Sequence, residues 1–148
     1  MAVFRYRLQN ILNIKEQLKT QAEMEFGFAQ AKLNEEEERL RLLKERREGY
    51  IEEGRRMRME VLDVRKLAEN ERSVKAMDEF VEGQRENVRL AERAVEAARA
   101  KLTEAMKEVK IQEKLREQAF EAFLEEQKVA EAKEIDELVS YRYGQKGS

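Results

Sequence analysis

One dense group of side chains in this sequence could bind a metal ion or transfer protons: the four consecutive glutamates Glu35 to Glu38. A metal ion or a proton-transfer site needs carboxylates that converge on one point. Successive residues of a helix instead point around its circumference. We therefore expect these glutamates to form a solvated charged face, with no metal site and no catalytic residue.

A basic group, Arg55, Arg56 and Arg58, has the side chains that bind phosphates. Glutamates such as Glu52 and Glu60 lie within one helical turn, however, and can pair with these arginines. The formal net charge of the chain is -2, and no aromatic platform accompanies the arginines. We therefore expect no nucleic-acid partner.

Whole classes of chemistry are excluded by missing residue types. The chain has no Cys, no His and no Trp. Disulfides, Cys/His zinc sites, thiol nucleophiles and imidazole bases are therefore impossible. No Gly-rich phosphate loop follows an expected strand, because no strand is expected. We expect neither enzymatic activity nor a cofactor.

The composition is that of a long helix. Charged residues make up 42% of the 148 residues, against about 25% in an ordinary globular domain. Hydrophobic residues make up 41%, and proline is absent. The longest unbroken apolar run is Met1 to Phe4, too short for a transmembrane span or a secretory signal, so we expect a cytoplasmic protein.

The apolar residues follow the 3.5-residue spacing of coiled coils in two separate stretches. In the first stretch, alternating steps of four and three residues meet Ala22, Phe26, Ala29, Leu33, Glu36, Leu40, Leu43, Arg47, Tyr50, Gly54, Met57, Val61, Val64 and Ala68. In the second, they meet Met77, Val81, Gln84, Val88, Ala91, Val95, Ala98, Leu102, Ala105 and Val109. We call each of these two rows of positions a seam. The alternation of four and three is interrupted once in each seam by two consecutive steps of four, which we call a slip. Folding back near residue 70 would place position 22 opposite position 118 and align the two slips.

These patterns predict an all-α fold, a long two-helix antiparallel coiled-coil hairpin that forms a single domain over residues 1–148. We expect arm one at about 4–68, a turn at about 69–73, arm two at about 74–141 and a short tail at 142–148. In the turn, Asn70 can end one helix and Ser73 can cap the next. No glycine or proline marks this turn, so one unbroken helix through the stretch is the alternative. We expect a monomer. A structural alternative is a spacer or dimerisation protein whose halves pair in parallel with another copy.

Some aromatic residues lie outside the seams. Phe80 is next to seam residue Val81, so a two-helix arrangement leaves its ring at the flank, and the predicted turn places Met59 and Leu62 near its level. Phe4, Tyr6, Tyr141 and Tyr143 are interleaved with arginines at the two ends of the chain. For Phe80, a half-buried flanking position and a docking role are both open. The aromatic residues at the two ends of the chain favour a docking role, because chain ends normally carry few aromatic residues.

Four segments together resemble the flagellar export protein family FliJ. They are the opening FRYRLQNILNIKEQLKTQAEMEF, the proline-free body with two seams, the segment AMDEFVEGQRENV and the ending AKEIDELVSYRYGQ. The resemblance implies a non-enzymatic, stalk-like component of the flagellar type III export apparatus. Its implied partners are the hexameric export ATPase, whose assembly it promotes, the cytoplasmic domain of the membrane export gate, and export substrate chaperones. The implied location is the cytoplasmic face of the inner membrane at the flagellar base, as a peripheral component.

The resemblance also assigns residues to two contact surfaces. For the export gate these are Phe80, Tyr50, Leu43 and Gln84, the last at a position where relatives often carry an apolar residue. For the ATPase ring they are Leu8, Ile11, Leu12, Tyr141 and Arg142, with Asp136 and Glu137 at matching positions.

Overall fold

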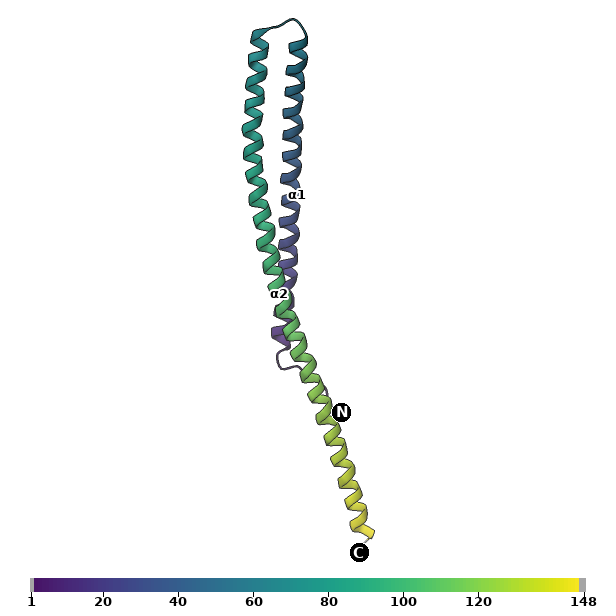
Figure 1. Ribbon diagram of the computed structural model, residues 1–148. Helices are drawn as coiled ribbons and strands as arrows, with labels where there is room; N and C mark the ends of the chain where they lie inside the picture. Colours follow the sequence, from purple (N-terminus) through teal and green to yellow (C-terminus); the bar gives the residue numbers. More distant parts are fainter. Residues whose placement is uncertain (1, 147–148) are drawn as a thin grey trace. The chain divides into compact units, whose positions relative to one another are not determined.

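Two helices account for nearly all of the chain in the computed structural model, which describes residues 2–146. Helix α1 comprises Gln9–Met59, and helix α2 comprises Val64–Lys146 (Figure 1). No strand occurs in the described residues. The predicted all-α class and antiparallel helical hairpin are confirmed. Within residues 2–146, neither helix contains a stretch long and apolar enough to cross a membrane.

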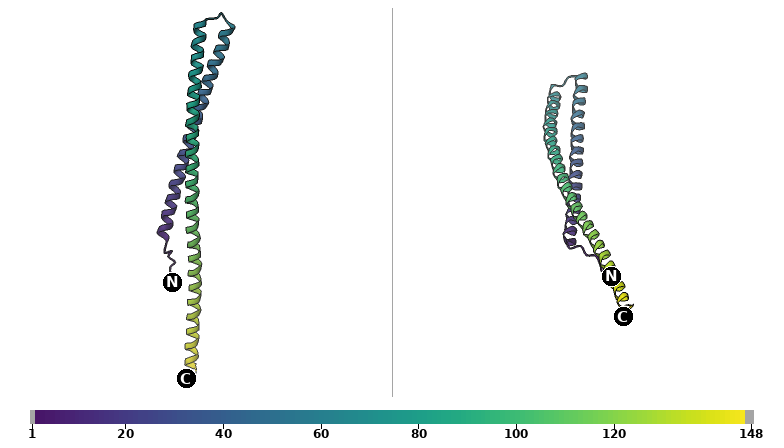
Figure 2. Two further views of the ribbon diagram at one scale, coloured as in Figure 1. Left: turned by 60° about the vertical axis from the view of Figure 1, so that its left-hand side comes forward. Right: turned by 60° about the horizontal axis from the view of Figure 1, so that its bottom comes forward.

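The contacts divide the chain into two compact units. One unit consists of Met1–Thr20 and Glu104–Ser148, and the other of Gln21–Thr103. Each unit contains part of α1 and part of α2. In the unit 21–103, both views in Figure 2 show the two helices side by side beneath their connection. The single domain expected over 1–148 stays a prediction.

The connection between the helices lies at residues 60–63, where Asp63 caps α2. Asp63 Oδ1 accepts hydrogen bonds from the backbone N–H of Arg65 at 3.1 Å and of Lys66 at 3.4 Å. These are the second and third residues of α2, the usual donors to an N-cap side chain. The prediction of a turn at about 69–73 is wrong, because Asp63 starts the second helix earlier.

Asn70 lies inside α2, and its side chain contacts α1. It is buried, and its Nδ2 donates to the backbone carbonyl of Tyr50 at 2.8 Å. A Cβ built on Gly54 would lie 2.4 Å from Asn70 Oδ1, so Gly54 provides the space for this side chain. Asn70 therefore donates a hydrogen bond between the helices and ends neither of them.

The early connection also changes which residues face each other. In the unit 21–103, Arg47 pairs with Asp78, and Glu25 Oε2 lies 2.8 Å from Lys101 Nζ. In the other unit, Lys15 Nζ lies 3.3 Å from Glu108 Oε2. The members of each pair lie about equally far from residue 62 in the sequence. The expectation that position 22 faces position 118 is therefore wrong, and the two slips do not align.

The seams form the buried interior. The buried apolar residues are Leu12, Ala22, Met77, Val81, Val88, Ala91, Val95 and Val109. Seven of these eight lie on the two seams listed from the sequence, and Leu12 precedes them. The 3.5-residue spacing therefore identified the faces by which the helices pack.

The two ends of the chain differ from the predicted arms. Residues 2–8 precede α1 and are not helical, whereas arm one was expected from residue 4. Helix α2 continues to Lys146, so the tail expected from residue 142 is helical that far. The rest of that tail, residues 147–148, lies outside the described residues.

Candidate interaction surfaces

The first candidate surface lies in the unit 21–103 and contains Phe80, whose side chain is 59% exposed. A surface groove beside it is lined by Arg39, Leu42, Leu43, Glu45, Arg46 and Gln84. Phe80 precedes Gln84 by four residues, and residues at this spacing are neighbours on a helix surface. We call Phe80 and the groove residues other than the buried Gln84 the Phe80 surface.

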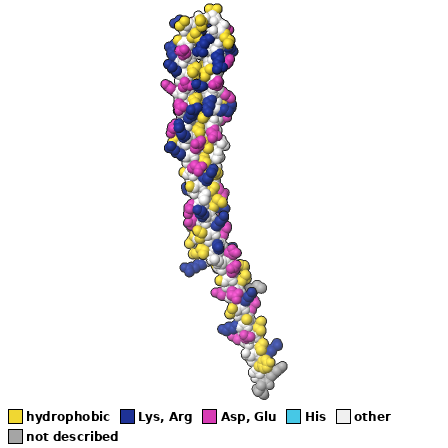
Figure 3. Space-filling view, in the orientation of Figure 1, with side chains coloured by type: hydrophobic (Ala, Val, Ile, Leu, Met, Phe, Trp, Pro, Cys, Tyr) yellow, Lys and Arg dark blue, Asp and Glu magenta, His cyan; other side chains and the backbone are white. Residues whose placement is uncertain are grey.

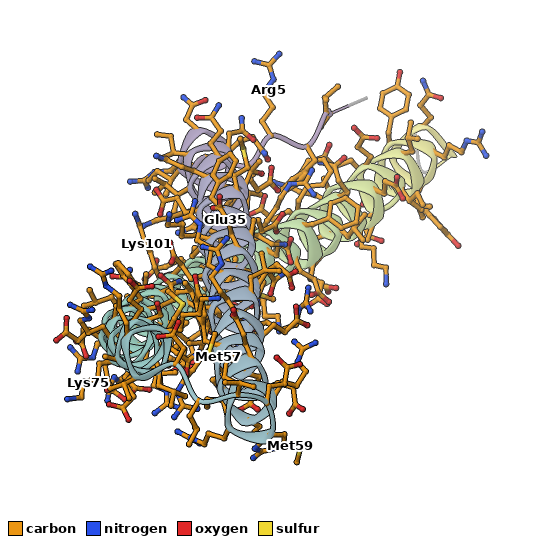
Figure 4. All side chains as sticks on the ribbon, turned by 90° about the horizontal axis from the view of Figure 1, so that it is seen from above. Arg5, Glu35, Met57, Met59, Lys75 and Lys101 are labelled. Atoms are coloured by element: carbon orange, nitrogen blue, oxygen red, sulfur yellow. The ribbon has the colours of Figure 1, made fainter. Side chains whose placement is uncertain are left out.

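The residues expected at the export gate occupy different environments. Leu43 and Tyr50 are half-buried, and Leu43 lines the groove. Gln84 is buried, so its amide faces the interior. The expectation that Met59 and Leu62 lie at the level of Phe80 is wrong, because the register about residue 62 puts residue 44 at that level. Met59 ends α1 and points away from α2 (Figure 4).

Beneath this surface, Glu36 and Gln84 form a buried polar pair between the helices. Gln84 Nε2 donates to the backbone carbonyl of Glu36 at 2.9 Å and also to its carboxylate. The other carboxylate oxygen of Glu36 lies 2.9 Å from Lys32 Nζ and 3.3 Å from Arg39 Nη1. The hydrogen bond from Lys32, and then that from Gln84, hold the pKa of Glu36 below its ordinary value.

Glu36 differs from its neighbours in the acidic group. Glu35, Glu37 and Glu38 are exposed, as expected, but the expectation of solvent exposure is wrong for Glu36. A signal for this was present in the sequence, since Glu36 and Gln84 both occupy seam positions. Two polar residues on facing seams indicate a buried hydrogen-bonded pair, which can fix the register of a coiled coil.

The second candidate surface lies in the other unit, on α2 beyond the segment that contacts α1. Every residue from 128 to 144 is exposed. We call this stretch the free segment. Ile135, Leu138 and Val139 lie on one side of it, at spacings of three and four residues, and all three are exposed. A helix face of this kind is suited to packing against a partner.

The residues expected at the ATPase ring are divided between packed and free parts of this unit. Leu12 is buried and Leu8 is half-buried, while Ile11 is 40% exposed. Tyr141 is 65% exposed, and Arg142 is also exposed; both lie in the free segment. Asp136 and Glu137 are exposed in the same segment.

The N-terminal aromatic residues do not meet the C-terminal tyrosines. The ring centroid of Phe4 lies 5.1 Å from that of Phe120 and 5.5 Å from that of Phe123. Tyr6 OH donates to Gln112 Oε1 at 3.1 Å. Tyr141 lies 18 residues beyond Phe123, about 27 Å along the helix at about 1.5 Å per residue. The docking end expected where both termini meet is therefore replaced by a packed N-terminal segment and a free C-terminal helix.

Charge also differs between the two parts of this unit. Residues 1–20 carry Arg5, Arg7, Lys15 and Lys19 against Glu16 alone. The free segment carries Glu131, Glu134, Asp136 and Glu137 against Lys128, Lys133 and Arg142. Figure 4 shows Arg5 pointing away from the helices, and Figure 3 shows apolar side chains between charged ones along the visible face. The exposed end of α2 is therefore amphipathic and slightly acidic.

Comparisons with known proteins agree with this architecture. The model of the FliJ family, described as flagellar FliJ protein, matches residues 4–148. A search of curated proteins gives no significant match. A solved structure described as a YscO homologue, CT670 from Chlamydia trachomatis, is similar with a TM-score of 0.73 and 24% sequence identity. The similarity covers 95% of this chain and 96% of that one, and it shows a shared fold.

Proposed function

Because the chain belongs to the flagellar FliJ family, we propose that it is a stalk-like, non-enzymatic protein that binds the ring of the flagellar export ATPase and links it to the export gate. The family is associated with type III protein export. The proposal adds specific partners and a specific use of the two surfaces described above.

One observation carries the ring-binding part of the proposal, namely the free segment of α2. Its apolar residues Ile135, Leu138 and Val139 are exposed, and Tyr141 is accessible beside Arg142. Aromatic and arginine side chains are the commonest anchors of protein interfaces. A helix with these residues and no intrachain cover is suited to enter a ring of subunits.

Such binding would promote ring assembly without any catalytic group. A protein that binds the assembled ring more tightly than free subunits shifts the equilibrium towards the ring. ATP hydrolysis then rises if the assembled ring is the active form. We assign this role to the free segment. Leu8, Ile11 and Leu12 belong to the same unit and would support that role.

The Phe80 surface is the proposed contact for the cytoplasmic domain of the export gate. Phe80 offers an exposed ring, and Leu43 in the adjoining groove offers a further apolar side chain. Tyr50 is half-buried and lies on the same seam of α1 as Leu43. Gln84, being buried, would act by holding α2 against Glu36, without touching the gate. Through these contacts the protein would be held at the cytoplasmic face of the membrane, where export substrate chaperones are further partners.

Binding of two purified partners to two variants tests the proposal. The double variant Tyr141→Ala/Arg142→Ala should bind the export ATPase at least about tenfold more weakly, because an interface anchor is worth 1.4 kcal/mol or more, while its binding to the gate domain should be unchanged. Phe80→Ala should show the opposite pattern.

Phe28→Ala is the matched control, because Phe28 is also exposed on a helix surface. It should leave both affinities unchanged. Two outcomes would contradict the proposal of separate sites. In one, each test variant weakens both interactions equally; in the other, neither variant weakens either interaction.

A further inference from the structure

A third surface, used by neither proposed contact, lies in the unit 1–20 with 104–148, where both helices expose apolar residues. On α1, Ile14 is 53% and Leu18 is 48% exposed. On α2, Ile111 is 54% and Leu115 is 40% exposed. Each pair is spaced by four residues, so each forms a short apolar stripe along its helix.

The ion pair between Lys15 and Glu108 shows that the two stripes border the same face. It bridges α1 and α2 at 3.3 Å. Leu18 lies three residues after Lys15, and Ile111 lies three residues after Glu108, so both are surface neighbours of the bridge. Two apolar stripes on adjacent helices form the kind of surface against which a third helix can pack.

A row of lysines runs along the α2 side of this face. Lys107, Lys110 and Lys114 are exposed, at spacings of three and four residues. Lys107 lies four residues before Ile111, and Lys114 lies three residues after it, so both are beside the apolar stripe. Among the residues that the structure describes, none of the three lysines forms an ion pair.

We propose that this face, formed by Ile14, Leu18, Ile111 and Leu115 with Lys107, Lys110 and Lys114 at its border, receives an amphipathic helix of a protein partner. The partner helix would place its apolar side against the two stripes and a row of carboxylates beside the lysines. Charge complementarity of this kind selects partner and register. The inference does not depend on the proposed function, because none of these seven residues belongs to the ring or gate surfaces.

The test uses two labelled helical peptides of three heptads with Leu at positions a and d. One peptide carries Glu at the flanking positions and the other carries Lys. Fluorescence anisotropy with the full-length protein at low salt should show at least about tenfold tighter binding of the acidic peptide. Equal affinities for the two peptides, or no binding, would overturn the proposal.

Variants locate the site. Ile14→Gln/Ile111→Gln should weaken binding of the acidic peptide at least about tenfold, whereas Leu90→Gln, at a similarly exposed position, should not. Lys107→Glu/Lys110→Glu/Lys114→Glu should reverse the preference between the peptides. The same charge reversal at Lys66, Arg72 and Lys75 is the control and should leave the preference in place.

Sedimentation velocity distinguishes a second copy from a partner protein. If the protein forms dimers that Ile14→Gln/Ile111→Gln disrupts, the face is an interface between copies and the proposal is wrong. A monomer at all concentrations, together with the peptide preference, supports a partner helix.

Discussion

At the scale of single residues, the buried side chain of Asn70 on α2 limits the size of the residue at position 54 on α1. Asn70 donates to the carbonyl of Tyr50, and its Oδ1 occupies the space where a Cβ of residue 54 would lie, at 2.4 Å. A larger residue at position 54 must displace the Asn70 side chain or push the helices apart. The glycine that weakens α1 as an isolated helix is therefore needed for packing.

Gly54→Ala should lower the free energy of unfolding by about 1–3 kcal/mol, the usual cost of overpacking. Gly49→Ala is the matched control in the same helix, because nothing lies within 4 Å of its added Cβ. The control should raise stability by up to about 1 kcal/mol through helix propensity. Urea denaturation followed by circular dichroism measures both. Equal effects at the two positions would show that Asn70 does not require the glycine.

The buried carboxylate of Glu36 should make stability depend on pH. Its pKa is lowered in the folded protein by the hydrogen bonds from Lys32 and Gln84. A lowered folded-state pKa adds stability above the unfolded-state pKa, and this stability is lost as the pH falls through the folded-state value. Acidification below the ordinary carboxyl range should therefore destabilise the protein.

Comparison of two variants isolates this contribution from that of the other carboxylates. The unfolding temperature of the Glu36→Gln variant should fall less with acidification than that of the unchanged protein. Glu37→Gln removes an exposed neighbouring charge and should keep the full decline. Parallel pH profiles for the Glu36 variant and the unchanged protein would mean that the Glu36 carboxylate does not contribute in this way.

At the scale of helices, the seams were predictable and the connection was not. Residues such as Val81, Val88 and Val95 lie on the expected face because the 3.5-residue spacing reports burial directly. The connection was assigned to Asn70 and Ser73 by their capping preferences. Asp63 has the same preference, and only the tertiary contact of Asn70 with Tyr50 and Gly54 decides between the two positions.

The candidate surfaces were predictable to a smaller extent. Phe80 stood out because it lies beside a seam, and it is exposed as that position suggests. Gln84 was assigned to a surface although it lies on a seam, and it is buried. The free segment could not be found, because its existence depends on the register and therefore on the place of the connection.

Spin-label distances test the register within the unit 21–103. Labels at Arg47 and Asp78 should be close, since these residues form an ion pair. Arg47 and Arg93 would face each other in a register centred on residue 70. Labels at these two positions should be separated by about 22 Å more along the helix axis than the labels at Arg47 and Asp78, at about 1.5 Å per residue. A short Arg47–Arg93 distance would contradict the connection at residues 60–63.

The same experiment separates a hairpin from a parallel dimer. Dilution of doubly labelled protein with an excess of unlabelled protein should leave the Arg47–Asp78 distance unchanged, because both labels are in one chain. A signal that disappears on dilution would indicate pairing between copies and favour the dimerisation alternative.

At the scale of the whole molecule, separate surfaces have separate proposed tasks. The free segment is proposed for the ATPase ring, the Phe80 surface for the export gate and the lysine-bordered apolar face for a partner helix. The proposed action of all three surfaces is through binding. The free segment is proposed to promote assembly of the ATPase ring.

The most direct test is the rate of ATP hydrolysis by the flagellar export ATPase, at a concentration where its ring is only partly assembled. The full-length protein should raise the rate, and Phe80→Ala should raise it equally. A chain truncated after Ala132 loses the residues from 133 onward, including Tyr141 and Arg142, but keeps the packing of Phe4 on Phe120 and Phe123. It should give little or no stimulation. Absence of stimulation by the full-length protein, or equal stimulation by the truncated chain, would contradict the account.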